Sequence, residues 1–340
     1  MKRNYKMASK RNHNHLVFIM WSLFLLVSAL AFYVFIQGNT EQSNTYRFVL
    51  ILKKVDENND FWRSLIEGAR IGVEELNGQL EVRGPDSEED IAGQNAIIAQ
   101  TIAQAPDVIL LVPSSVTETT PYIQKAIDAG IVVILVDSVV AEEIGHGLVA
   151  TDNVQAGISL AEFGMGFMNP DTQIGIVAHV KDTSTTIDRV AGIRYGLQDE
   201  AERIVDMVFS DSSPELAYTL TKQMLSRHPE ITLLFATNEP SAVGAARALR
   251  DLELYGQVSL IGFDNSIEQI QFLEKDIIQG IVIQKPVNMA YLAVKQGYQA
   301  LQSGNIQVPI DSGSLLIDQS NMYFGANQRL LFPFFEPLPD

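Results

Sequence analysis

The chain has 340 residues, 46% of them hydrophobic, and a formal net charge of −17 at pH 7. Residues 1–40 contribute +5, so the rest carries −22, which argues against nucleic acid as a partner because phosphate backbones are bound by basic patches. The absence of cysteine excludes disulfide bonds, thiolate metal sites, a cysteine nucleophile and a lipid-modified cysteine.

The N-terminus combines a basic head at residues 1–15 with an uncharged stretch at residues 16–37. As a helix, the stretch would rise about 33 Å, enough to cross a hydrocarbon core. The basic head predicts a cytoplasmic N-terminus and an extracytoplasmic remainder. A signal peptide cleaved at Ala29–Ala31 is the alternative, but its apolar region is ordinarily only about 7–15 residues long. The length favours an uncleaved transmembrane signal anchor, followed by a polar linker at residues 38–45.

Beyond the linker, short apolar runs alternate with amphipathic helical patterns. Continuous runs of this length are typical of strands buried on both faces of a parallel sheet. The alternation predicts an α/β fold with right-handed crossovers, and the chain length favours two lobes. The runs are Phe48–Leu52, Val108–Val112, Val132–Val136, Ile174–Ala178, Leu233–Ala236, Ser259–Gly262 and Gly280–Ile283, with a shorter one at Gly147–Ala150.

Polar residues that follow these strands are candidates for a site, because open α/β sheets bind ligands outside the carboxyl ends of their strands. Carboxylate, amide and guanidinium groups can each engage adjacent hydroxyls, and an aromatic ring can pack on the C–H face of a sugar. The sequence therefore favours a small polyhydroxyl ligand. The candidates are Asn58, Asn59, Phe61, Asp137, Arg189, Asn238, Asp264 and Gln284.

Several of these positions also have a purely structural interpretation. Trp62 falls on the apolar stripe of its helix, which leaves Phe61 as the candidate for stacking. The other structural interpretations are helix capping by Asp60, Asp152 and Asn153, a surface ion pair of Arg189 with Asp188 or Glu202, and an Asx turn at Asp264.

Short segments carry a resemblance to a known family through their order along the chain. They are Asn58–Trp62, Val136–Asp137, Thr151–Asn153, Arg189–Gly192, His228–Glu230, Phe235–Glu239, Ile261–Asp264 and Ile283–Gln284. With them, the chain from Tyr46 to about Leu330 resembles the type I periplasmic sugar-binding proteins of the ribose- and galactose-binding kind. This family shares its fold with the ligand-binding core of lactose-repressor-type regulators.

The resemblance implies two open parallel-sheet, Rossmann-like lobes joined by a three-crossing hinge, with the ligand in the cleft between them. The N-terminal lobe would comprise residues 46–151 plus 285–313, and the C-terminal lobe residues 152–284 plus 314–330, before a tail at residues 331–340. The crossings would fall near Asp152, Gln284 and Gly313. Asn58 or Asn59, Phe61 and Asp137 would contact the ligand from the first lobe; Arg189, Asn238, Asp264 and Gln284 would do so from the second lobe and hinge.

Three positions depart from the ribose-binding pattern. Ser138 stands in place of an arginine, Val112 in place of an asparagine, and Ser212 where an aromatic residue is expected. The ligand therefore need not be ribose, although the retained polar residues favour a monosaccharide.

Other functions fit the sequence less well. An enzyme is not expected, because Lys53–Asp60 lacks the glycines of a dinucleotide site and no P-loop, cofactor or metal-ligand spacing is present. A transcriptional regulator would need an N-terminal DNA-binding helix pair where this chain has its apolar stretch. The expected function is extracytoplasmic solute binding for the permease subunits of an ABC-type sugar importer. The alternative is presentation of a sugar or non-sugar ligand to a sensor histidine kinase.

Overall fold

The computed structural model describes residues 18, 20–33, 45–56 and 59–332. The chain forms two compact units, Met1–Thr45 and Tyr46–Asp340. In the first unit, residues 20–33 are helical, and their large apolar side chains are at least 57% exposed. Within the described ranges, no helix combines the length and the hydropathy of a membrane span.

Parts of several predicted segments lie outside the described residues. These are the whole basic head at 1–15, both ends of the anchor at 16–37, the linker at 38–45 apart from its last residue, and the tail at 331–340 from residue 333 onward.

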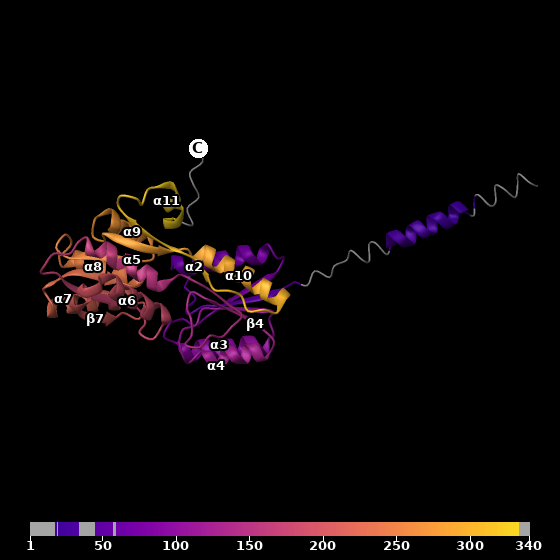
Figure 1. The fold of residues 1–340 in the computed structure, drawn as a ribbon, viewed down its shortest axis with the longest axis horizontal. Coiled ribbons are helices and arrows are strands. Elements are labelled where there is room, and N and C mark those ends of the chain that lie inside the picture. Colours follow the sequence, from indigo (N-terminus) through magenta and orange to yellow (C-terminus); the bar gives the residue numbers. More distant parts are fainter. Residues whose placement is uncertain (1–17, 19, 34–44, 57–58, 333–340) are drawn as a thin grey trace, which may run out of the picture. The chain divides into compact units, whose positions relative to one another are not determined.

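The second unit contains two α/β lobes, each built on one six-stranded sheet (Figure 1). The sheet of the first lobe is parallel throughout. Its strands, in spatial order, are β2 (Gln79–Arg83), β1 (Arg47–Ile51), β3 (Val108–Leu111), β4 (Val132–Val136), β5 (Gly147–Ala150) and β11 (Ile310–Asp311). Every residue of β3 and β4 is buried, as their unbroken apolar sequence predicts.

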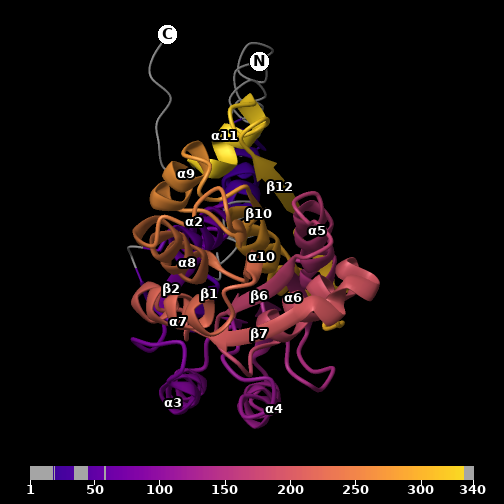
Figure 2. The same cartoon turned by 90° about the vertical axis from the view of Figure 1, so that its left-hand side faces the viewer.

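Helices cover both faces of the first sheet. Phe48 and Leu50 pack in the core under α2 (Asp60–Glu74) and α10 (Pro286–Ser303), whereas Val49 and Ile51 face the opposite side. That side is covered by α3 (Ile91–Ala103) and α4 (Thr120–Asp128), which lie side by side (Figure 2). The α2–α10 contact is very close, since a Cβ at Gly68 would lie 2.1 Å from the carbonyl oxygen of Val287.

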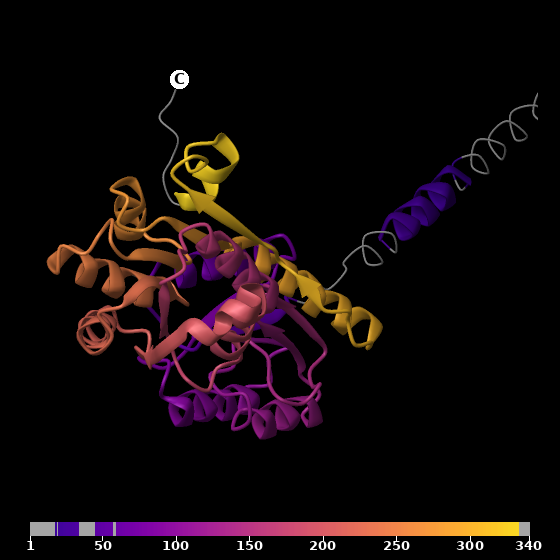
Figure 3. The same cartoon turned by 60° about the vertical axis from the view of Figure 1, so that its left-hand side comes forward.

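The sheet of the second lobe is parallel except for β12, which pairs antiparallel with β10. Its strands, in spatial order, are β7 (Ile204–Phe209), β6 (Gln173–Ala178), β8 (Ile231–Ala236), β9 (Ser259–Phe263), β10 (Gly280–Gln284) and β12 (Ser314–Asp318). One face packs on α5 (Asn153–Met165), α6 (Ser184–Leu197) and the 3₁₀ helix η1 (Gln198–Arg203). The other packs on α7 (Pro214–Arg227), α8 (Glu239–Asp251) and α9 (Ile267–Glu274). The C-terminal α11 (Gly325–Leu331) follows β12 and joins the same core through Leu331 (Figure 3).

Three segments connect the lobes: β5 to α5, β10 to α10, and β11 to β12. The Thr151 hydroxyl donates to Gln284 Oε1 at 2.8 Å and lies 3.3 Å from the Ser312 hydroxyl. One buried side chain therefore joins all three crossings.

Candidate ligand-binding cleft

Residues that follow strands of both sheets border one cavity of about 50 Å³. The small volume shows that the two lobes approach closely here. The first lobe contributes Lys53, Asn59, Phe61, Trp62, Glu88 and Asp137 to its lining. The second contributes His179, Thr185, Arg189, Asn238, Glu239, Pro240, Asp264 and Gln284.

Most residues predicted for ligand contact meet at this cavity. They are Asn59, Phe61, Asp137, Arg189, Asn238, Asp264 and Gln284. Asn58 lies outside the described residues. Of the predicted hinge positions, Asp152 and Gly313 lie in two of the crossings, and Gln284 ends β10 beside the third.

The two lobes present a carboxylate to the cavity by the same backbone geometry. Asp137 follows β4 and Asp264 follows β9, and both have a φ of +63°. Their backbone N–H groups donate to the neighbouring strand, to Val149 at 2.9 Å and to Val282 at 2.8 Å. Non-glycine residues rarely adopt this left-handed backbone, and such strain concentrates at functional sites.

The Asp137 carboxylate is held by two neighbours of the first lobe. Lys53, which comes shortly after β1, places its Nζ 3.4 Å from Asp137 Oδ2, and both side chains are 4% exposed. The Ser138 hydroxyl donates to the same oxygen at 2.9 Å. The serine that replaces the expected arginine thus positions the aspartate.

Arg189 is buried in the second lobe and is not a surface ion pair. Its Nε donates to Asn153 Oδ1 at 2.8 Å and its Nη1 to the carbonyl oxygen of Thr237 at 2.7 Å. The guanidinium lies 3.7 Å from the centre of the Phe263 ring, and Nη1 is 3.8 Å from Asp264 Oδ2. The cap interpretation of Asn153 is wrong, because Asp152 caps α5 and leaves Asn153 to orient Arg189.

Gln284 links the cavity to the hinge. Its Nε2 donates to Asp264 Oδ1 at 2.7 Å, while its Oε1 accepts the Thr151 hydroxyl. Burial raises the pKa of Asp264, and the positive charge of Arg189 and the hydrogen bond from Gln284 oppose that rise. A ligand that contacts Asp264 would therefore contact a side chain that is linked to all three crossings by hydrogen bonds through Gln284 and Thr151.

The two asparagines each serve as a helix cap and as a cavity donor. Asn59 Oδ1, rather than Asp60, accepts the first backbone N–H groups of α2, and its Nδ2 lies 3.4 Å from Glu239 Oε2 across the lobes. Asn238 caps α8 through Ser241, and its Nδ2 donates to Ser212 at 3.0 Å. Because the amide oxygen of each asparagine accepts the capping hydrogen bonds, its N–H groups point away from the helix and can donate to other groups.

The positions that depart from the ribose-binding pattern have different roles. The Ser212 hydroxyl, where an aromatic residue was expected, donates to Glu88 Oε2 at 3.0 Å and so bridges the two lobes. Val112 is fully buried and does not line the cavity. Ser212 therefore makes a polar contact between the lobes where an aromatic residue was expected, and it does not line the cavity.

Four charged or titratable lining residues were not among the predicted ligand contacts: Lys53, Glu88, His179 and Glu239. His179 lies between Thr237 at 2.7 Å and Thr185 at 2.9 Å, and burial is the main cause that lowers its pKa well below the ordinary value, so the ring is neutral at pH 7. Lys53 and His179 follow β1 and β6 closely, so the rule that polar residues after strands are site candidates (the strand-end rule) also applies to them. In the described part of the chain, no cluster of three or more His, Asp or Glu side chains is arranged to hold a metal ion.

Comparison with known proteins places this geometry in a family. A D-ribose/D-allose-binding protein of Pseudomonas aeruginosa is 28% identical over 279 residues, which cover 80% of this chain and 84% of that protein. A crystal structure of a sugar transporter from Clostridium phytofermentans is 35% identical with a TM-score of 0.76, covering 81% of this chain and all of that one. An ABC transporter solute-binding protein from Agrobacterium vitis with bound D-fucose is 25% identical with a TM-score of 0.80, covering 84% of this chain and 99% of that one.

These relatives are solute-binding proteins, not enzymes, as the sequence analysis predicted for this chain. Residues 48–305 match the model of the periplasmic binding protein domain. The two α/β lobes and the three connecting segments described above agree with that match. The chain belongs to the periplasmic binding protein family.

Proposed function

We propose that the chain captures a small polyhydroxyl ligand, a monosaccharide, in the cavity between its lobes and releases it unchanged. The observation that carries the proposal is the convergence of Asp137, Arg189, Asn238 and Asp264 on one interlobe cavity. Together they offer donors and acceptors in fixed planes, which suit adjacent hydroxyls. The bound D-fucose of the Agrobacterium vitis relative supports the same ligand class.

The contacts from the first lobe would come from Asn59, Phe61 and Asp137, with Asn58 as a further candidate. Phe61 lines the cavity and meets Trp62 edge to face, with ring centres 4.9 Å apart. Trp62 is 6% exposed and belongs to the core of the first lobe. Phe61 is therefore the side chain that we propose to pack on the C–H face of a sugar ring.

The lobes would divide at residues 151/152, 284/285 and 313/314, and would close about these three crossings when ligand binds. Gly313 has a φ of +81°, a conformation that suits a hinge glycine. A ligand favours closure only if it contacts both lobes, because it must bind the closed state more tightly than the open one. The opposed carboxylates Asp137 and Asp264 would provide such contacts.

The ligand-binding unit would be extracytoplasmic and held at the membrane by an uncleaved helix at residues 16–37. Residues 1–40 contain five basic and no acidic residues, and residues 16–37 contain no charge. ABC permease subunits are the partner that we propose, in line with the ABC transporter relative from Agrobacterium vitis. A sensor histidine kinase remains the second candidate, because a permanent anchor keeps the protein beside a membrane partner. Co-purification of the full chain with permease subunits supports transport, and co-purification with a kinase supports sensing.

A thermal-shift screen of the full chain in detergent tests the ligand class. A sugar present at a hundred times its dissociation constant adds about 2.7 kcal/mol to the free energy of unfolding, which corresponds to a rise in Tm of roughly 5–10 °C. Pentoses, hexoses and sugar alcohols form the panel. A rise with one of them supports the proposal, and no rise with any sugar contradicts it.

A further inference from the structure

The interlobe cavity is lined by more acidic than basic side chains. Four carboxylates face two cations; the carboxylates are Glu88, Asp137, Glu239 and Asp264, and the cations are Lys53 and Arg189. His179 adds no charge at pH 7, because burial and the nearby cations keep its ring neutral. The lining of the cavity therefore has an excess of two carboxylates.

Both cations already have a carboxylate partner. Lys53 Nζ lies 3.4 Å from Asp137, and Arg189 Nη1 lies 3.8 Å from Asp264. Arg189 also donates hydrogen bonds to Asn153 and to the carbonyl oxygen of Thr237. The two carboxyl groups of the lining that lack a cationic partner are therefore those of Glu88 and Glu239.

Glu88 and Glu239 are held by neutral donors. Glu88 Oε2 accepts the Ser212 hydroxyl at 3.0 Å, and Glu239 Oε2 lies 3.4 Å from Asn59 Nδ2. In the described ranges, neither carboxylate has a cationic nitrogen within 4.0 Å. From further away, the charges of Lys53, Lys54 and Arg189 act on Glu88, and that of Arg247 acts on Glu239. Burial is the main cause that raises the pKa of both groups, that of Glu239 to about 7. A cationic ligand group beside these carboxyls would stabilise their charged form, which burial disfavours.

We infer that the cavity selects a sugar that carries a protonated amine over its neutral parent, and that it rejects sugars that carry a carboxylate. The inference rests on the proposed function and names the ligand class more closely. An ammonium group has three donors and no acceptor, which matches carboxylate oxygens that only accept. A charge-assisted hydrogen bond is about twice as strong as a neutral one, so one new pair corresponds to a gain of about tenfold in affinity. An acidic sugar would instead bring a fifth carboxylate to the cavity.

Isothermal titration calorimetry of the full chain in detergent at pH 7.5 tests this inference. The ligands are glucosamine, galactosamine and mannosamine, each beside its parent hexose, its N-acetyl derivative and the uronic acid of the parent hexose. Salt at about 0.15 M limits attraction by the overall charge, because the Debye length is then about 8 Å. At least one amine should bind about tenfold tighter than its parent and its N-acetyl derivative, and no uronic acid should bind.

Variants assign the effect to the two carboxylates. Glu88→Gln and Glu239→Gln should each reduce the preference for the amine severalfold. Glu89→Gln is the matched control, since it removes the same charge one residue from Glu88 at an exposed position that does not line the cavity, and it should leave the preference unchanged. Neutral hexoses that bind as tightly as their amines overturn the inference and leave the proposed function standing. No binding by any sugar, neutral or charged, overturns both.

Discussion

Asp137 and Asp264 illustrate how single residues form this site. Each occupies a left-handed backbone position at the end of a central strand, one in each lobe, and each is paired with a cation. Breaking such a buried pair leaves an uncompensated charge, which costs more than the pair itself contributes. Loss of either partner should therefore affect ligand binding strongly.

Arg189→Ala should weaken sugar binding by roughly 2–5 kcal/mol, because the substitution leaves Asp264 buried without its cation. Titration calorimetry with the sugar identified by the thermal-shift screen measures the change. Arg250→Ala is the control, since that arginine is exposed and pairs with Asp251 on the surface. Equal affinities for wild type and Arg189→Ala would show that the arginine does not contact or organise the ligand site.

The raised pKa of Glu239 predicts a pH dependence of stability. The pKa is about 7 in the folded chain against an ordinary value of 4.5, so the folded state binds more protons between these values. The contribution of Glu239 to the free energy of unfolding is therefore fully present below pH 4.5 and is lost as the pH rises through 7. The loss is at most about 3 kcal/mol before solvent screening. Urea unfolding at several pH values should show that Glu239→Gln loses less stability than wild type over this range. Parallel curves for the two proteins would contradict the assignment.

The strand-end rule accounts for much of the cavity lining but not for all of it. It identified Asp137, Asn238 and Asp264, and it also applies to Lys53 and His179, which the sequence analysis left out. Lysine and histidine are common on surfaces, and only the structure shows that these two are buried. Glu88 could not be identified in this way, because it lies in a loop after an unpredicted strand.

At the scale of elements, central strands were predictable and edge strands were not. β3 and β4 are apolar throughout and fully buried. β2 has the sequence QLEVR with no fully buried residue, and β7 is only partly buried along its length. Edge strands bury less of their surface than central ones, so their sequences lack the continuous apolar signal on which the prediction depends. The antiparallel β12 was missed for the same reason, because it is the other edge strand of its sheet and only one of its residues is fully buried.

Helix caps connect local structure to the cavity, and this connection can be tested at Asn238. Asn238→Ala should lower the free energy of unfolding by about 0.5–2 kcal/mol through loss of the α8 cap, and should also weaken sugar binding. Ser213→Ala is the matched control, because Ser213 caps α7 without lining the cavity. The control should lose a similar amount of stability and keep its affinity. Equal affinities for both variants would show that Asn238 is only a cap.

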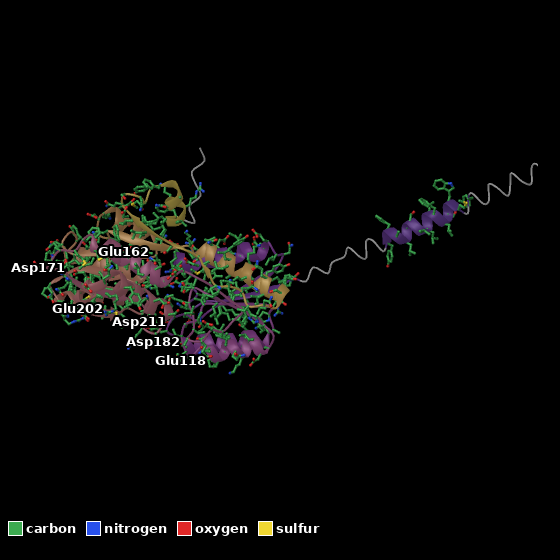
Figure 4. The ribbon with its side chains drawn as sticks, in the orientation of Figure 1. Glu118, Glu162, Asp171, Asp182, Glu202 and Asp211 are labelled. Carbon is green, nitrogen blue, oxygen red and sulfur yellow. The ribbon has the colours of Figure 1, made fainter. Side chains whose placement is uncertain are left out.

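At the scale of the molecule, the two lobes are joined by three short segments and by few side-chain contacts. The Ser212–Glu88 hydrogen bond and the bond from Val139 N–H to the Ser184 hydroxyl cross between them. Figure 4 labels exposed acidic residues on both lobes, among them Glu118 on the first and Asp182 on the second. The sequence has no cysteine, so labels can be introduced at such positions without removing native thiols.

Closure by hinge motion predicts a change in the distance between the lobes. Spin labels at Glu118→Cys and Asp182→Cys should show a broad distance distribution in the free protein that narrows and shortens when the sugar is added. Labels at Glu162→Cys and Asp171→Cys, both in the second lobe, serve as the control and should show no change. An unchanged interlobe distribution at saturating sugar would contradict closure.

The two-lobed architecture was predictable because most buried strands are followed by a helix and the chain is long enough for two cores. The hinge was not predictable from local patterns, since the bonds among Thr151, Gln284 and Ser312 join residues far apart in sequence. The positions of the crossings came from the family resemblance instead. Long-range polar contacts of this kind have no periodic signal in a single sequence.

The most direct test of the account is a crystal structure of the full chain with the sugar identified by the thermal-shift screen. The account predicts one sugar molecule in the interlobe cavity, with its hydroxyls within hydrogen-bond distance of Asp137, Arg189, Asn238 and Asp264 and its ring against Phe61. A sugar bound elsewhere, or in this cavity without contact to either aspartate, would contradict the central claim.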